Sequence, residues 1–208
     1  MRNAIYLFGL FILSACQQST GNGDTTIHQT TATSSSSPNI PETSDTYNGF
    51  TIVNKGPRGG GYTDPAGHPL GYRIFRVQLI NDSLVPLDFN INFTSNDVPL
   101  RPKSDGHLKV FLFPKSMTPD KQEEYDFGIT GLPAFLDTGL REPTKLQITI
   151  QPKKEYVFYV GALLYYSNGS ARAKLIASGQ YLIYKIDINE PPPVSAEIPC
   201  GQFRFHTQ

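Results

Sequence analysis

The sequence contains no tryptophan, only two cysteines and few charged residues, and each scarcity excludes a class of protein. Charged residues make up 17% of the chain and their formal sum is zero. The composition therefore supplies neither the basic stripe of a nucleic-acid-binding protein nor a basic membrane patch, and we expect no nucleic-acid partner. The lack of tryptophan counts against a dedicated aromatic platform for sugars, although 11 tyrosines and 13 phenylalanines are present.

The N-terminal apolar run is too short to cross a bilayer as a helix, which needs about 20 residues. It covers residues 4–13, is interrupted only by Gly9, and follows Arg2, the one charged residue before Asp24. A positive charge followed by a short apolar core is typical of a secretory signal peptide. We expect residues 1–15 to direct export without anchoring the chain.

The signal ends in Leu13-Ser14-Ala15-Cys16, an apolar residue and two small residues before a cysteine. This motif resembles the lipobox of bacterial lipoproteins, whose cysteine is lipidated and becomes the mature N-terminus. The resemblance implies that Cys16 is lipidated and that its acyl chains, palmitate among them, insert into a bilayer. Gln17 stands where an aspartate would favour inner-membrane retention, so the outer membrane is expected, with the domain facing periplasm or surface. An ordinary secretory signal with an incidental cysteine is the alternative.

Residues 16–46 are rich in serine and threonine and contain no aromatic residue. Such a segment buries too little apolar surface to offset the entropy of ordering it. We expect it to be a disordered tether that begins at the lipidated Cys16. Residues 47–208 then suffice for one domain with its own core.

Cys200 has no partner for a disulfide once Cys16 is lipidated. One hypothesis makes Cys200 a nucleophile or an intermolecular thiol. The favoured one makes it a small buried side chain beside the last strand, because free cysteine is commonly buried and the nearest histidine along the chain is His206.

Alternating apolar and polar residues predict β-strands through the domain. Residues 87–94 alternate without a fault, which predicts one face on a core and one in water. Residues 156–166 are almost continuously apolar and rich in aromatic and β-branched side chains, which predicts a central strand buried on both faces. Further strands are predicted at residues 49–54, 72–81, 108–113, 146–150, 171–177, 180–188 and 202–206.

Short strands separated by proline and glycine predict an all-β fold, a single immunoglobulin-like or related antiparallel β-sandwich of about eight or nine strands. Short helices are predicted at residues 119–124 and 133–138, the second with proline at its start and glycine after its end. Residues 167–170, Ser-Asn-Gly-Ser, predict a hairpin turn.

Residues 146–160 resemble the paired strands around a proline-containing turn in immunoglobulin-like domains of bacterial surface proteins. More broadly, the chain is similar to uncharacterised lipoproteins of Bacteroidota, a likeness that implies no activity. A domain of about 160 residues exceeds the roughly 100 of an immunoglobulin-like domain, so residues 95–107 and 114–145 are expected to be long insertions.

The most unusual local sequence is Gly-Pro-Arg-Gly-Gly-Gly-Tyr at residues 56–62, which includes Arg58 and Tyr62. A glycine cluster can bind an anion through backbone N–H groups, with Arg58 adding charge. Phosphate loops, however, lead into a helix, and this one leads into a strand. We expect a mobile or tightly turned loop between strands, and a contact surface at its tip.

Tyr165 and Tyr166 lie at the end of the predicted central strand, next to a turn. Aromatic side chains in such a place stack on sugar rings or anchor a protein partner. The alternative is packing in the core and at its rim. Arg58, Tyr62, Tyr165 and Tyr166 are therefore the candidate ligand-binding residues.

No catalytic or metal-binding pattern is present in the sequence. The four histidines are far apart, no calcium-loop spacing of aspartates occurs, and we expect neither metal nor cofactor. Glu123, Glu124 and Asp126 are nominal glycosidase acids, but adjacent acids in a lysine-rich turn are more typical of a solvated loop.

These features together predict a non-catalytic lipoprotein anchored at the cell envelope, a binding module whose partner is another protein such as an outer-membrane assembly. One alternative is a surface carbohydrate-binding module. The other is a glycan hydrolase on a β-scaffold, which needs acids gathered in a cleft.

Overall fold

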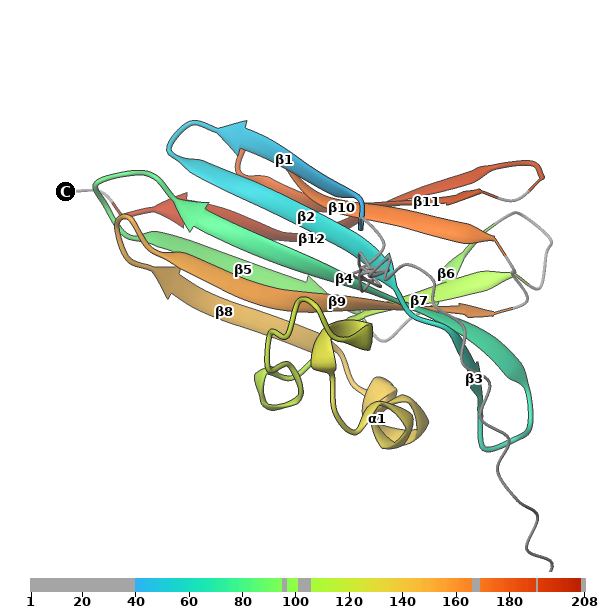
Figure 1. Ribbon diagram of the computed structural model, residues 1–208. Coiled ribbons are helices and arrows are strands. Elements are labelled where there is room, and N and C mark those ends of the chain that lie inside the picture. The colour runs from blue at the N-terminus through green and yellow to red at the C-terminus, as the bar shows by residue number, and fades with distance from the viewer. Residues whose placement is uncertain (1–39, 95–96, 101–105, 166–168, 190, 207–208) are drawn as a thin grey trace, which may run out of the picture. The chain divides into compact units, whose positions relative to one another are not determined.

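The computed structural model describes residues 40–94, 97–100, 106–165, 169–189 and 191–206 (Figure 1). These residues form two antiparallel sheets that pack on each other, which confirms the predicted all-β sandwich, but with twelve strands and not the eight or nine predicted. The predicted signal peptide, with Cys16, and most of the predicted tether lie outside the described residues.

One sheet has seven strands in the order β1-β2-β4-β9-β7-β6, with β3 paired to part of β4. Its strands are β1 (Glu42–Tyr47), β2 (Phe50–Arg58), β3 (Gly61–Thr63), β4 (Pro69–Asn81), β6 (Val98–Pro99), β7 (His107–Leu112) and β9 (Glu155–Tyr165). As predicted, β9 is a central strand, paired with β4 and β7 and buried on both faces over most of its length.

The other sheet has five strands in the order β10-β11-β12-β5-β8. Its strands are β10 (Ser170–Ser178), β11 (Tyr181–Asn189), β12 (Val194–Phe205), β5 (Leu87–Phe93) and β8 (Thr144–Ile150). The alternation of β5 is confirmed, since Leu87, Phe89, Ile91 and Phe93 are all buried between the sheets.

The main hydrophobic core fills the space between the two sheets. Phe50 and Phe75 of the larger sheet meet Phe89, Phe93 and Tyr184 of the smaller one there, all at most 2% exposed. Ring pairs such as Phe50 with Phe89, 5.5 Å between centroids, cross from sheet to sheet. Burial of these rings is the main stabilising contribution to the sandwich.

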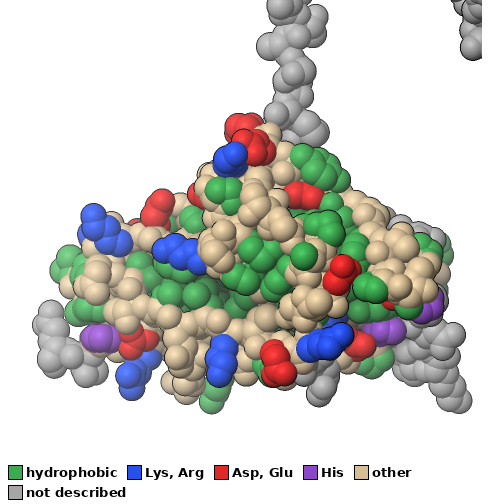
Figure 2. All heavy atoms as spheres, turned by 90° about the horizontal axis from the view of Figure 1, so that it is seen from below, with side chains coloured by type: hydrophobic (Ala, Val, Ile, Leu, Met, Phe, Trp, Pro, Cys, Tyr) green, Lys and Arg blue, Asp and Glu red, His purple; other side chains and the backbone are tan. Residues whose placement is uncertain are grey.

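A second core lies on the outer face of the seven-stranded sheet, beneath residues 113–143, which we call the insertion. The insertion contains the helix α1 (Leu132–Thr138), close to the predicted helix, and three 3-10 turns, η1 (Lys115–Met117), η2 (Tyr125–Gly128) and η3 (Gly139–Arg141). Its buried apolar side chains pack on those of β4, β7 and β9. In Figure 2, which views this side, positive and negative side chains are interspersed and neither gathers into a patch.

Several predictions about local structure are wrong. Residues 119–124 form no helix, because Asp120 has a positive φ of 54° that a right-handed helix does not accept. The strands on either side of residues 167–170, β9 and β10, lie in different sheets and so do not form a hairpin. The predicted tether also reached too far, since β1 begins at Glu42 and its backbone pairs with β2.

The glycine-rich residues 56–62 are mostly strand, where a loop between strands was predicted. β2 continues to Arg58 and β3 starts at Gly61, and both pair with β4 across an irregular register. A β carbon on Gly59 would lie 2.3 Å from the carbonyl oxygen of Tyr72. Glycine therefore allows the two backbones to come close enough to pair.

Part of the strand order matches that of an immunoglobulin domain. β2, β4, β9 and β7 follow the order of strands A, B, E and D, and β5 takes the place of C in the second sheet. The last strands differ, because β12, the final strand, pairs with β5, whereas the final strand of an immunoglobulin domain lies at the edge. None of the helices in the described part of the chain is long and apolar enough to span a bilayer.

Candidate functional site

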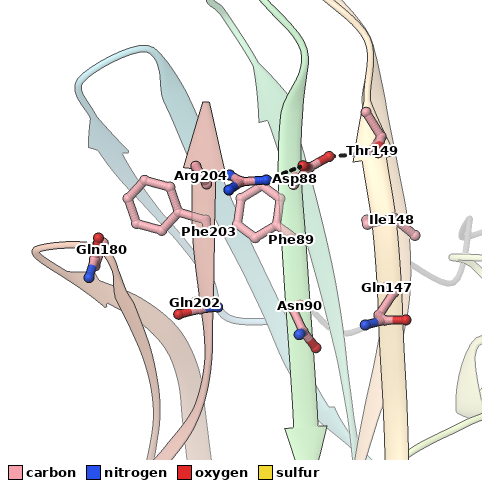
Figure 3. A pocket seen from close by; sticks show the side chains of 10 residues that line it. All are labelled: Asp88, Phe89, Asn90, Gln147, Ile148, Thr149, Gln180, Gln202, Phe203 and Arg204. Atoms are coloured by element: carbon pink, nitrogen blue, oxygen red, sulfur yellow. Dashed lines mark hydrogen bonds and ion pairs between the residues drawn. The ribbon is translucent and has the colours of Figure 1, made fainter. Parts of the chain in front are cut away.

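The outer face of the five-stranded sheet carries two adjoining hollows, of about 620 Å³ and 540 Å³ (Figure 3 shows the first). Both are lined by outward-pointing side chains of β5, β8 and β12, and Asn90, Gln147 and Gln202 border both. We call the two hollows together the groove. Its floor is the sheet itself, with Phe89 and Phe203 packed beneath it in the core.

Four exposed side chains from neighbouring strands form a row across the groove. Tyr181 of β11 is opposite Gln202 of β12. Gln202 is opposite Asn90 of β5, which in turn is opposite Gln147 of β8. Because neighbouring strands lie about 4.8 Å apart, this cross-strand row spans about 14 Å.

The three amides of the cross-strand row keep their hydrogen-bonding groups available. None of these side chains bonds to another residue in the ranges described. An amide carries both donors and an acceptor, so it can bond to a hydroxyl in either direction. Asparagine is disfavoured in strands, so strand propensity does not explain Asn90 and Asn92 on β5.

The first hollow has a charged end built around Asp88. Thr149 donates a hydrogen bond to this carboxylate at 2.6 Å, His206 Nε2 lies 2.9 Å away, and an Arg204 nitrogen lies 3.8 Å away. The pKa of Asp88 is lowered, mainly by the Thr149 hydrogen bond and then by His206. The carboxylate is thus already partnered, and Arg204 offsets its charge.

The second hollow continues from the cross-strand row along β5 and β8. Asn92, Thr94, Lys145, Tyr181 and Pro199 line it together with the shared amides. Tyr181 is one of three large hydrophobic side chains that are strongly exposed in the described part of the chain, at 58%. It offers a flat ring beside the amides, as a stacking surface for a ligand.

The predicted ligand residues Arg58 and Tyr62 lie on the other sheet and hold the insertion in place. Arg58 donates a 2.5 Å hydrogen bond to the carbonyl oxygen of Gln122 and lies over the ring of Phe127, 4.5 Å from its centroid. Tyr62 donates a hydrogen bond to Asp137. Neither residue lines the groove, and their role in ligand binding stays a prediction.

The other two predicted ligand residues also lie apart from the groove or outside the described residues. Tyr165 stacks on His107 with 4.2 Å between ring centroids, at the end of β9. Tyr166 and Cys16 are among the residues that the structure does not describe. The sequence therefore pointed to aromatic residues on the larger sheet, and the groove is on the smaller one.

The acids nominated for hydrolysis do not converge in a cleft. Asp126 is a buried residue of the insertion, Tyr72 of β4 donates a 2.6 Å hydrogen bond to it, and its other oxygen has no partner. Burial raises the pKa of Asp126. Glu123 and Glu124 are exposed at the surface of the insertion.

The insertion is also held by an ion pair on the same face of the sheet. Arg76 of β4, 5% exposed, donates to both oxygens of Asp120 at 2.8 Å and 3.2 Å. Tyr159 of β9 donates to the same carboxylate at 2.5 Å. The polar residues of this face therefore hold the insertion against the sheet.

Cys200 is buried and faces the core side of β12. Its side chain is 2% exposed and its Sγ donates to the carbonyl oxygen of Leu182 at 3.5 Å. Burial raises the pKa of the thiol to about 12. Both observations favour the hypothesis of a small buried side chain over that of a nucleophile.

Metal binding finds no support in this geometry. Across the residues that the structure covers, no three histidine, cysteine, aspartate or glutamate side chains gather closely enough to hold an ion.

No family model matches the sequence, and no curated protein is similar to it. The groove is therefore interpreted from its own chemistry.

Sequence reasoning missed the groove although part of its signal was visible. The alternation in β5 places Asn90 and Asn92 on the solvent face, and that of β8 does the same for Gln147. Three polar residues on separate strands form a site only if the strands are neighbours in register. That neighbourhood depends on pairings between distant residues: Gln202 is 112 residues from Asn90 in the chain, and Gln147 is 57 residues from Asn90.

Proposed function

We propose that this protein is a non-catalytic binding module, lipid-anchored at the cell envelope, whose groove binds a glycan chain. The observation that carries the proposal is the cross-strand row, in which three unpaired amides and one exposed tyrosine line a hollowed sheet face. This favours the carbohydrate-binding alternative over a protein-binding surface, because the centre of a protein interface is richer in apolar side chains.

The chemistry of the row matches a polyhydroxyl ligand. Each sugar hydroxyl both donates and accepts hydrogen bonds, and each amide of Gln202, Asn90 and Gln147 can do the same. The ring of Tyr181 can pack on the C–H face of a sugar at little cost in side-chain entropy. A row of about 14 Å suits several consecutive sugars of a chain better than a single one.

The groove is open along the sheet and does not enclose its ligand. Hollows of about 620 Å³ and 540 Å³ that share three side chains suit a polymer that passes through, with only part of it bound at once. Lipidation at Cys16 and the Ser/Thr-rich tether, both expectations from sequence, would hold such a module at a membrane while the domain reaches its ligand.

The test is a binding screen with the full-length lipidated protein, purified in mild detergent, against immobilised neutral and acidic polysaccharides. Positives are then measured by calorimetry with oligosaccharides of defined length. Gln202→Ala and Gln147→Ala should each weaken binding about 3- to 10-fold, the loss of one net hydrogen bond. Gln151→Ala, an exposed amide outside the groove, should leave the affinity unchanged.

Substitutions of aromatic residues distinguish glycan binding in the groove from glycan binding at the site predicted on the larger sheet. Tyr181→Ala should weaken glycan binding more than Tyr181→Phe, which keeps the ring, and Tyr165→Ala should have no effect. If Tyr165→Ala abolishes binding and Tyr181→Ala does not, the glycan site is not the groove. If no polysaccharide is retained, and cross-linking in cells recovers a stoichiometric envelope protein instead, glycan binding is wrong.

A further inference from the structure

The two hollows of the groove differ in charge, and we infer from this difference that the glycan is an acidic one, with Lys145 binding the carboxylate of a uronic acid. This inference rests on the proposed function and names the class of sugar. It concerns the second hollow, where the cross-strand row continues towards Asn92 and Lys145.

In the first hollow the charges are balanced within the protein. Of the ten residues that line it, Asp88 and Arg204 are the two charged ones, and they lie 3.8 Å apart. Asp88 is further held by Thr149 and His206. This end of the groove therefore has no formal charge left for a ligand, and it suits neutral sugar.

In the second hollow one charge stands without a counter-charge. Lys145 is the only ionised side chain among the ten residues that line it, the others being amides, Thr94, Tyr181, Pro199, Cys200 and Gly201. No ion pair or hydrogen bond joins the Lys145 ammonium to any other residue in the described part of the chain. Its side chain is exposed, at the solvent-facing position of β8 two residues from Gln147.

The neighbouring surface reinforces the positive charge. On its other side Lys145 lines a smaller hollow of about 100 Å³, and a second lysine, Lys115, lines the same hollow. None of the residues around that hollow is an acid. Two lysines, one from β8 and one from η1, and no acidic residue thus border this smaller hollow.

The position of Lys145 relative to the amides sets where the acid group should lie. Lys145 is opposite Asn92 on β5, two residue pairs from Asn90 and Gln147, so the two polar pairs are neighbours on the same face of the sheet. Alternate residues of a strand are about 6.8 Å apart. A sugar bound by Asn90 and Gln147 would therefore have Lys145 within reach of a carboxylate on its ring, and Asn92 could donate to the same group.

The test uses matched pairs of ligands that differ in charge alone. The full-length protein is titrated with oligosaccharides of alginate, polygalacturonate and hyaluronan, and with the carboxyl-reduced form of each, in which the uronate is replaced by the neutral sugar. We expect at least one acidic form to bind about tenfold more tightly than its reduced form, the effect of one charge-assisted hydrogen bond. That preference should weaken with added salt.

Variants then assign the preference to a residue. Lys145→Gln should remove the preference for the acidic form and leave binding of the reduced form unchanged, and Lys145→Arg should retain it. Lys185→Gln serves as the matched control, because Lys185 is on the same sheet but already lies 3.7 Å from Glu197. It should bind both forms as the wild type does.

The outcomes separate this inference from the proposed function. If acidic and reduced forms bind equally, or if Lys145→Gln keeps the preference, the inference is overturned while glycan binding stands. If the protein binds neither form of any glycan, both fall. A preference that Lys145→Gln abolishes, with the reduced form still bound, establishes both.

Discussion

The backbones of Asn90 and Gly201 approach each other so closely that a β carbon on Gly201 would lie 1.9 Å from the carbonyl oxygen of Asn90. These residues belong to β5 and β12, the two central strands beneath the groove. Only the absence of a side chain lets the strands pair at this point. Gly201 therefore determines the spacing of the amides that the two strands carry.

Gly201→Ala should force β5 and β12 apart, since the contact is with backbone and no side chain can move away. We expect a loss of about 3 kcal/mol in the free energy of unfolding, as for other overpacked positions. Thermal or urea denaturation followed by circular dichroism measures it. Gly61→Ala is the control, because nothing lies within 4 Å of its added β carbon; equal stability of the two variants would contradict the prediction.

Asp120→Asn should destabilise the protein, because it leaves the Arg76 guanidinium buried beside a neutral group. The expected loss is about 2 kcal/mol, below that of fully buried pairs since Asp120 is itself partly exposed. The Arg76 hydrogen bond holds the pKa of Asp120 below its ordinary value of 3.8. The stabilisation is therefore present above that pH and lost as pH falls through the lowered pKa.

The urea midpoint of Asp120→Asn should thus differ most from that of the wild type near neutral pH and least in acid. Glu123→Gln, an exposed neutralisation in the same segment, is the control. A difference that stays constant over the whole pH range would mean that the charge of Asp120 does not stabilise the fold.

Asp126→Asn should have the opposite sign and stabilise the protein at neutral pH. Burial raises the pKa of Asp126 above its ordinary 3.8. Ionisation of Asp126 therefore destabilises the folded wild type, and this loss of stability develops as pH rises from 3.8 through the raised pKa. Asparagine keeps an acceptor for the Tyr72 hydroxyl, carries no charge and tolerates the positive φ of 52° at this position.

We expect a gain of about 1 kcal/mol for Asp126→Asn near neutral pH, shrinking to nothing in acid. Urea unfolding at several pH values measures it, with Tyr72→Phe as a companion variant that removes the hydroxyl donor. The account fails if Asp126→Asn is less stable than the wild type at neutral pH.

Cys200 should resist thiol reagents in the folded protein. With its pKa near 12 and its side chain 2% exposed, very little thiolate is present and none of it is accessible. Maleimide labelling followed by mass spectrometry should show modification only after denaturation. Ser195→Cys provides an exposed thiol on the same strand for comparison. If Cys200 of the native protein is labelled as fast as this exposed thiol, the hypothesis of a reactive thiol is restored.

Much of the fold could be predicted because its strands show local patterns of apolar and polar residues. The strands β5 and β8 alternate with the period of the pleat, and β9 is a continuous apolar run, so their existence and their buried faces could be predicted directly. β1 lacks such a pattern, since its first five residues, Glu-Thr-Ser-Asp-Thr, are all polar, and it is held by backbone pairing with β2 and by Tyr47, which stacks on Phe50. Composition alone assigned it to the tether.

The candidate site could not be predicted because it depends on pairing between distant strands. The prediction relied on residues that are unusual in the linear sequence, Arg58 and Tyr62 among them, and the structure uses both to hold the insertion. Gln202 and Gln147 are unremarkable where they stand in the chain. They become a site only when the register sets both beside Asn90.

The two broad faces of the sandwich are unequal: the insertion covers the outer side of one sheet, and the described residues leave the outer side of the other uncovered. Side chains that point into water from a formed sheet contribute little to folding, and most substitutions there change stability by less than about 0.5 kcal/mol. Asn90, Gln147, Gln202 and Lys145 are of this kind. Substitutions at these positions could therefore change what the groove binds while the scaffold beneath it keeps its stability.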